Sequence, residues 1–123
     1  MTGHVGDAPR VPIQQARRCL IASLQVELSE AVLSQFRSDL LAKVRAVQPI
    51  GAILELSGIP LFDRHEFGSL RRTMDMVRLM GCPTVLVGIQ PGMAAAIAET
   101  DDHCDDLCTA RTLEEAFAIL NRS

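Results

Sequence analysis

Tryptophan and tyrosine are absent from this sequence, and phenylalanine occurs only four times in 123 residues. Leucine, isoleucine, valine, alanine and methionine must therefore fill most of the core, and apolar residues make up 48% of the chain, which is enough to build one. Lysine is nearly absent too: Lys43 is the only lysine, whereas the sequence has eleven arginines. The net charge of −3 argues against a nucleic-acid-binding surface.

Long apolar runs are also missing, since no run reaches the ~18 residues that a membrane span requires. Residues 1–9 are polar and contain glycine, so they lack the apolar segment of a signal peptide. We therefore expect a cytoplasmic protein without a membrane partner, in which residues 1–10 form a flexible tail and residues 11–121 one domain. The four cysteines are then expected to be free thiols.

Strand and helix patterns alternate along the chain. The apolar, β-branched runs predict strands at Val11–Gln14, Cys19–Leu24, Gly51–Leu56, Thr84–Gly88 and Leu107–Ala110. Helical spacing and capping residues predict helices that begin at Ser29, Asp63, Pro91 and Thr112. The order, with Arg17 and Arg18 at the turn of an opening hairpin, predicts an α/β fold. It has a four- to five-stranded, mixed and largely parallel sheet with about four helices.

Charged residues gather where the second helix begins. Asp63 and Glu66 have the spacing of a capping box, and Arg64 and His65 stand between them. Thr112 and Glu115 repeat this spacing before the last helix. Because strand-to-helix loops are where α/β domains present partner-binding groups, we expect a partner-binding site at Asp63, Arg64, His65 and Glu66.

Several stretches of the sequence resemble one known family. They are Val11-Pro12-Ile13, Cys19–Leu28, Leu56-Ser57-Gly58-Ile59-Pro60-Leu61-Phe62-Asp63, Val77-Arg78-Leu79-Met80-Gly81 and Val85-Leu86-Val87-Gly88-Ile89-Gln90-Pro91. Together they make the chain similar to STAS domains, the fold of anti-sigma-factor antagonists. Within that family the chain resembles the stressosome scaffold proteins of the RsbS and RsbR type.

The resemblance implies a function for the whole chain. Proteins of this family bind partners and are not enzymes, and no cofactor is expected. The implied partners are a serine/threonine kinase of the RsbT type and related STAS proteins, in a homo- or hetero-oligomeric complex that signals stress. Phosphorylation of a serine or threonine in the switch loop is expected to release the kinase.

The sequence departs from the family at the switch itself. The residue after the loop aspartate is usually the phosphorylated serine or threonine, and here it is Arg64. A cation in the first turn of a helix opposes the helix dipole, at a cost of about 0.3–1 kcal/mol. Three interpretations stay open: the switch is lost, the phosphate is carried by Ser57, or Arg64 pairs with an acidic group or a phosphate of a partner.

Two other kinds of site compete with this interpretation. A ligand- or metal-binding sensor would use the turn Gly88–Gly92, or His103, Cys104 and Cys108 as zinc ligands, although a fourth ligand is not obvious. Cys19 and Cys82 are expected to be core residues. A small hydrolase would need a nucleophile, a base and an orienting group that converge, and the neighbouring Ser57, Asp63 and His65 do not predict this.

Overall fold

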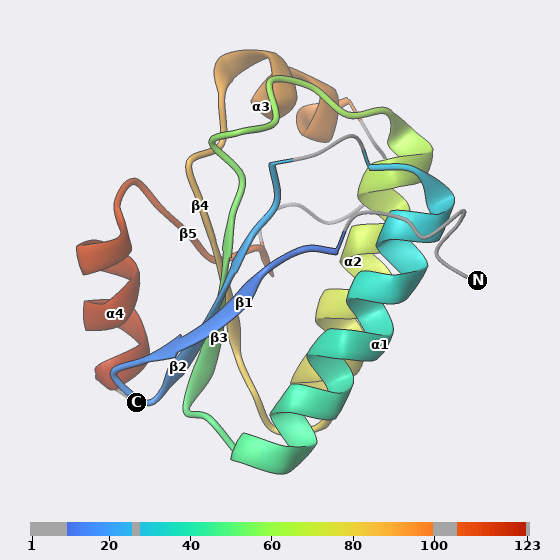
Figure 1. The fold of residues 1–123 in the computed structure, drawn as a ribbon. Helices are drawn as coiled ribbons and strands as arrows, with labels where there is room; N and C mark the ends of the chain where they lie inside the picture. The colour runs from blue at the N-terminus through green and yellow to red at the C-terminus, as the bar shows by residue number, and fades with distance from the viewer. Residues whose placement is uncertain (1–9, 26–27, 100–105, 123) are drawn as a thin grey trace.

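The computed structural model describes residues 10–25, 28–99 and 106–122 (Figure 1). Its elements in chain order are β1 (Ile13–Ala16), β2 (Cys19–Ser23), α1 (Glu30–Val47), β3 (Gly51–Glu55), α2 (Arg64–Leu79), β4 (Thr84–Val87), α3 (Pro91–Ala98), β5 (Thr109–Ala110) and α4 (Leu113–Asn121). The sheet has the order β1-β2-β3-β4-β5, in which only β1 and β2 pair in antiparallel fashion. The predicted α/β class and the mixed, largely parallel sheet are confirmed.

Successive side chains along the parallel strands point to opposite faces of the sheet, and this divides the core into two layers. Leu54 and Leu86 face the cluster that contains the buried side chains of α1, α2 and α3. Their neighbours Ile53 and Val85 face the second cluster, which contains Phe117 of α4. Figure 1 accordingly shows α4 on one side of the sheet, and α1 and α2 on the other. The central strands are therefore buried on both faces, as their continuous apolar sequences require.

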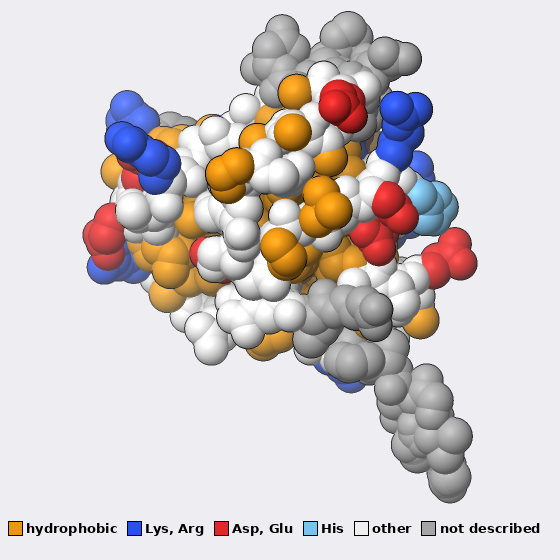
Figure 2. All heavy atoms as spheres, turned by 90° about the horizontal axis from the view of Figure 1, so that it is seen from above, with side chains coloured by type: hydrophobic (Ala, Val, Ile, Leu, Met, Phe, Trp, Pro, Cys, Tyr) orange, Lys and Arg blue, Asp and Glu red, His pale blue; other side chains and the backbone are white. Residues whose placement is uncertain are grey.

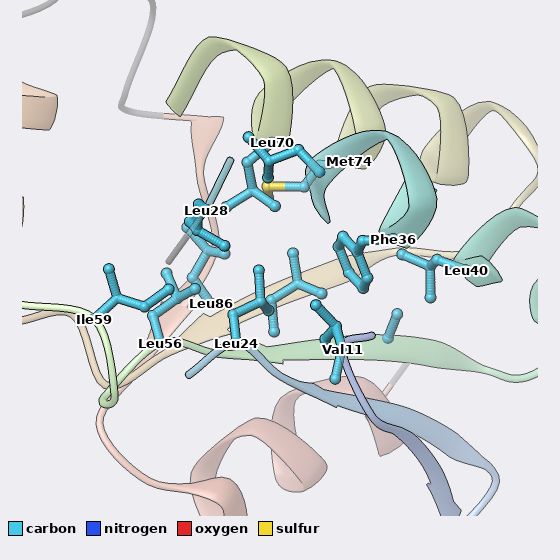
Figure 3. Packing of buried hydrophobic residues seen from close by; sticks show 14 of the residues in the cluster. Val11, Leu24, Leu28, Phe36, Leu40, Leu56, Ile59, Leu70, Met74 and Leu86 are labelled. Atoms are coloured by element: carbon cyan, nitrogen blue, oxygen red, sulfur yellow. The ribbon is translucent and has the colours of Figure 1, made fainter. Parts of the chain in front are cut away.

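The layer beneath α1 and α2 is filled mainly by aliphatic side chains. In Figure 3, Phe36 and Leu40 of α1 and Leu70 and Met74 of α2 lie above Leu86 of the sheet. All of these residues are at most 4% exposed. These residues form the inner faces of both long helices, where methionine and leucine replace the missing aromatic residues.

The opening hairpin differs from its prediction at the first strand. β1 begins at Ile13 rather than Val11 and continues to Ala16. Proline lacks an N–H group, so Pro12 joins the edge of the sheet only through its carbonyl oxygen, which accepts a bond from Ser23 N at 3.2 Å. The ladder with β2 therefore starts one residue after Pro12.

The predicted turn at Arg17 and Arg18 is confirmed. Both residues have positive φ, 52° and 67°, as a two-residue hairpin turn of the primed type requires. Arg17 lies over the Phe117 ring at 4.6 Å and bonds Glu114 Oε1 at 3.1 Å, which fastens the hairpin to α4. This hydrogen bond lowers the pKa of Glu114.

The end of the sheet at β5 also departs from the sequence prediction. β5 covers Thr109–Ala110 instead of Leu107–Ala110, although Cys108 O still accepts a bond from Leu86 N at 2.9 Å. Thr112 caps α4 through a bond from Glu115 N at 3.1 Å. The predicted second capping box is incomplete, because Glu115 Oε1 accepts from Arg111 N rather than from Thr112 N.

Candidate partner-binding site

The predicted site lies at the end of the sheet where β3 and β4 finish and α2 and α3 begin. Figure 2 views the molecule from this end, where charged side chains lie beside a group of apolar ones. Leu61, in the loop between β3 and α2, is an apolar residue that is 62% exposed. An exposed leucine next to charges gives this surface both apolar and ionic character.

Asp63 and Glu66 start α2 by satisfying each other's backbone. Asp63 Oδ1 accepts a hydrogen bond from Glu66 N at 2.7 Å, and Glu66 Oε1 accepts one from Asp63 N at 2.9 Å. The predicted capping box is therefore confirmed, and it satisfies two of the N–H groups that open the helix. Each carboxylate uses one oxygen for the box and has a second oxygen that can accept a hydrogen bond.

Arg64 is the first residue of α2, and its side chain is exposed. Within the described part of the chain, its guanidinium makes neither a hydrogen bond nor an ion pair. The nearby carboxylates of Asp63 and Glu66 are directed to the capping box instead. Arg64 thus presents an unpaired positive charge where the helix dipole is also positive, an arrangement that attracts anions.

His65 lies beside Arg64 and reaches toward the start of α1. Its Nε2 atom is 3.8 Å from Oε2 of Glu30, and both side chains are largely exposed. At this distance and exposure the pair contributes little to stability, even when the imidazole is protonated. His65 and Arg64 are therefore both accessible to a partner at the same corner of the molecule.

Ser57 is exposed but is not free. Its hydroxyl donates to Glu55 Oε1 at 2.7 Å, and its N–H donates to the same oxygen at 3.1 Å. The side chain of Gln90, from the next loop, donates to the carbonyl oxygen of Ser57 at 2.6 Å. Ser57 therefore joins the loop after β3 to the loop after β4.

Gly88 makes this close contact between the loops possible. It has a φ of +81°, and a Cβ atom placed on it would lie 2.9 Å from the Ser57 Cβ atom and 3.0 Å from Glu55 Oε2. Only glycine combines that backbone conformation with that approach. Glu55 and Gln90 were not predicted as parts of the site. The sequence did contain a signal for each of them. Glu55 is a charged residue at the end of the apolar strand β3, and Gln90 is a polar residue just before Pro91.

The predicted cysteine and histidine site is described only in part. His103 and Cys104 lie outside the described residues, and Cys108 is half-buried. Among the residues that the structure describes, no three histidine, cysteine, aspartate or glutamate side chains come together in a metal-binding group. Cys19 and Cys82 are buried, as predicted for core residues, and burial raises the pKa of Cys82 to about 11.

No helix in the described ranges is long and apolar enough to cross a membrane.

The order of strands, with α4 alone on one face of a mixed sheet, defines an α/β domain of the STAS type. The family model of the STAS domain matches residues 10–116, and the chain belongs to this family. No curated protein matched the sequence.

Three solved structures show how closely the fold is shared. A serine-to-glutamate variant of RsbS from Moorella thermoacetica is 24% identical with a TM-score of 0.80, over 91% of this chain and 95% of that one. A chain from a structure of the stressosome, which is a signal integration and transduction hub, is 23% identical with a TM-score of 0.80, over 90% of this chain and 96% of that one. The anti-sigma factor antagonist SpoIIAA, in its unphosphorylated form, is 15% identical with a TM-score of 0.66, over 92% and 98%.

Proposed function

We propose that the chain is a cytosolic STAS-domain scaffold that captures a serine/threonine kinase of the RsbT type. In this proposal it assembles with sister STAS proteins into a stressosome-type complex and acts by binding, not by catalysis. Membership of the STAS family supports the proposal, and so does the fold shared with RsbS and with a stressosome chain.

The observation that carries the proposal is the charge of Arg64, which is unpaired among the residues that the structure describes. Its side chain is exposed at the start of α2, while the capping box occupies the carboxylates on either side of it. A guanidinium can hold a carboxylate or a phosphate through two parallel hydrogen bonds. Arg64 would therefore anchor an acidic group of the kinase, with His65 and the free oxygens of Asp63 and Glu66 around it.

Arg64 also changes how capture is controlled. An arginine side chain has no hydroxyl group, so this position cannot be phosphorylated as the family's serine or threonine is. A phosphate placed there would add about −1.5 to −2 charges and repel an acidic group on the kinase. With a permanent positive charge instead, capture continues in the presence of ATP, and the protein is a fixed scaffold.

Arg64→Ala tests the proposed anchor. We expect the dissociation constant for the RsbT-type kinase to rise about tenfold or more, because truncating a charged anchor at an interface typically costs about 2 kcal/mol or more. Surface plasmon resonance with the immobilised kinase measures this change.

Arg72→Ala is the matched control for this experiment, because Arg72 is another exposed arginine of α2. Circular dichroism checks that both variants are folded. Unchanged affinity of Arg64→Ala, or an equal loss in Arg72→Ala, would show that Arg64 is not the anchor.

A second candidate is a phosphorylated switch at Ser57. The exposed hydroxyl favours it, since a kinase could reach the group. The Glu55 carboxylate opposes it, because that carboxylate lies 2.7 Å from the Ser57 hydroxyl and would repel a phosphate there. Phosphorylation at Ser57 would therefore break the hydrogen bond from its hydroxyl to Glu55 and loosen the loop that Gln90 holds, which would make it a switch at the site.

A further inference from the structure

The helices that follow β4 and β5 leave the sheet in opposite directions. α3 packs in the layer of α1 and α2, where its Met93 shares a cluster with Leu86 of β4. α4 packs on the other face, where Phe117 shares a cluster with Val85. Where neighbouring parallel strands send their helices to opposite faces, a crevice opens beyond their carboxyl ends, and ligands of open α/β sheets bind in such crevices.

A groove occupies this position in the structure. It has a volume of about 540 Å³, and its residues come from the ends of β4 and β5 and from α3 and α4. This volume is within the ~300–1,000 Å³ of small-molecule sites. The β4–β5 groove, as we call it, is lined among others by Gly88, Ile89, Ile97, Leu107, Arg111 and Glu115.

The groove combines an apolar wall with one cation. Ile89, Ile97 and Leu107 supply the apolar surface, and small side chains such as Ala94 and Ala98 leave room above it. Gly88 lines the groove through its backbone, because a Cβ atom on it would point toward Ser57 and Glu55 instead. Such a wall favours a ligand with an apolar body, because the removal of apolar area from water is favourable.

Arg111 defines the polar end of the groove. Its side chain is exposed and has no hydrogen bond or ion pair within the ranges that the structure describes. Glu115, on the same rim, directs Oε1 to the backbone N–H of Arg111 at 2.9 Å, so this oxygen does not occupy the guanidinium. The Arg111 fork is therefore available for a planar anion such as a carboxylate.

We propose that the β4–β5 groove binds a small carboxylic acid with an apolar body. The carboxylate pairs with Arg111, and the apolar body lies along Ile89, Ile97 and Leu107. Binding there would place a ligand next to Gly88, which contacts Ser57 in the partner-binding site. The groove would thus let a metabolite of this class act on the loop that we propose for kinase capture.

Titration of decanoate into ¹⁵N-labelled protein tests the binding site. Two-dimensional NMR records the amide signals at decanoate concentrations below the one at which decanoate forms micelles. We expect saturable shifts of the signals of Gly88, Ile97 and Arg111. Arg111→Gln should weaken binding about tenfold or more, because it removes a charge-assisted pair. Ala98→Trp should abolish binding by filling the groove.

The controls separate recognition of the acid from simple apolar adsorption. Arg45→Gln changes an exposed arginine of α1 and should leave the decanoate affinity unchanged. Decanol, which has the same chain without the charge, should bind more weakly than decanoate. Absence of saturable shifts, equal affinity for decanol, or full affinity in Arg111→Gln would each overturn the proposal. Kinase capture by Arg111→Gln is measured in parallel, and its retention shows that the scaffold function does not depend on this site.

Discussion

Single residues at the end of the sheet have separate tasks. Asp63 and Glu66 cap α2, Gly88 allows two loops to meet, and Gln90 holds the carbonyl of Ser57. Arg64 takes part in none of these contacts. Among the described residues its side chain has no structural partner, although a cation in the first turn opposes the helix dipole, which is why we propose a partner outside the chain for it.

Gly88→Ala tests the close approach between the loops. We expect it to lower the free energy of unfolding by about 2–4 kcal/mol, because a Cβ atom there meets Ser57 and the backbone has positive φ. Urea denaturation measures the change.

Gly68→Ala provides a control of opposite sign. A Cβ atom at this helical glycine would meet only Arg72 Nη1, at 3.9 Å. Replacing glycine by alanine within a helix then stabilises the protein by about 0.5–1 kcal/mol. If both variants were equally stable, the contact between Gly88 and Ser57 would not be tight.

The buried thiol of Cys82 predicts a pH dependence of stability. Burial raises its pKa from 9.0 to about 11. As the pH rises through this interval, the unfolded chain loses the proton before the folded chain does, so the free energy of unfolding falls. The contribution is fully present below pH 9 and is lost by about pH 11.

Urea denaturation of the wild type and of Cys82→Ala at pH 8 and pH 10.5 measures this contribution. We expect the wild type to lose more stability than the variant between the two pH values, because the other titrating groups are common to both proteins. Equal losses in the two proteins would show that Cys82 titrates as it does in the unfolded chain.

At the level of elements, α1 and α2 are joined by a polar clamp at the edge of their apolar contact. Arg37 Nε donates to Thr73 Oγ1 at 2.9 Å, and Nη2 donates to Ser69 O at 3.0 Å. Thr73 is only 1% exposed, and its hydroxyl accepts from Arg37 and donates to Ser69 O at 3.2 Å. The clamp holds the middle of α2 against α1.

Arg37→Ala is expected to destabilise the fold by about 1–3 kcal/mol, because it leaves the buried Thr73 hydroxyl without its donor. Arg45→Ala, at an exposed position of the same helix, should change stability by no more than about 0.5 kcal/mol. Thermal unfolding of the two variants provides the comparison. A similar effect of both substitutions would mean that the clamp does not contribute to stability.

The sequence predicted elements well where their limits depend on nearby residues. The caps at Ser29, Asp63 and Thr112 start the helices as expected, because a capping bond joins residues three apart. The sequence prediction failed where the start of a strand depends on its pairing with a neighbouring strand. This is the case for β1 after Pro12 and for β5, which is only two residues long.

The same distinction holds for the candidate site. The capping box of Asp63 and Glu66 was predictable from spacing, whereas the bond from Gln90 to Ser57 joins residues 33 apart. The approach of Glu55 to the position that a Cβ atom on Gly88 would occupy depends on the register of β3 and β4, which periodicity alone does not give. That Arg64 has no structural partner within the described residues is a property of the folded surface, and only the structure reveals it.

At the level of the whole molecule, the two layers of the core have different roles. The layer under α1, α2 and α3 supports the partner-binding site, and the layer under α4 fastens the opening hairpin through Arg17. Both loops of the site come from the carboxyl ends of neighbouring parallel strands. A rigid sheet thus presents two adjacent loops, which suits a protein that works by binding.

Intact-mass measurement after incubation with ATP and the RsbT-type kinase tests the fixed scaffold directly. We expect the wild type to gain no phosphate and to keep the kinase bound. Arg64→Ser, which restores a hydroxyl at the start of α2, should gain one phosphate and release the kinase. A phosphate on the wild type at Ser57, together with release of the kinase, would contradict the fixed scaffold and establish a switch at Ser57.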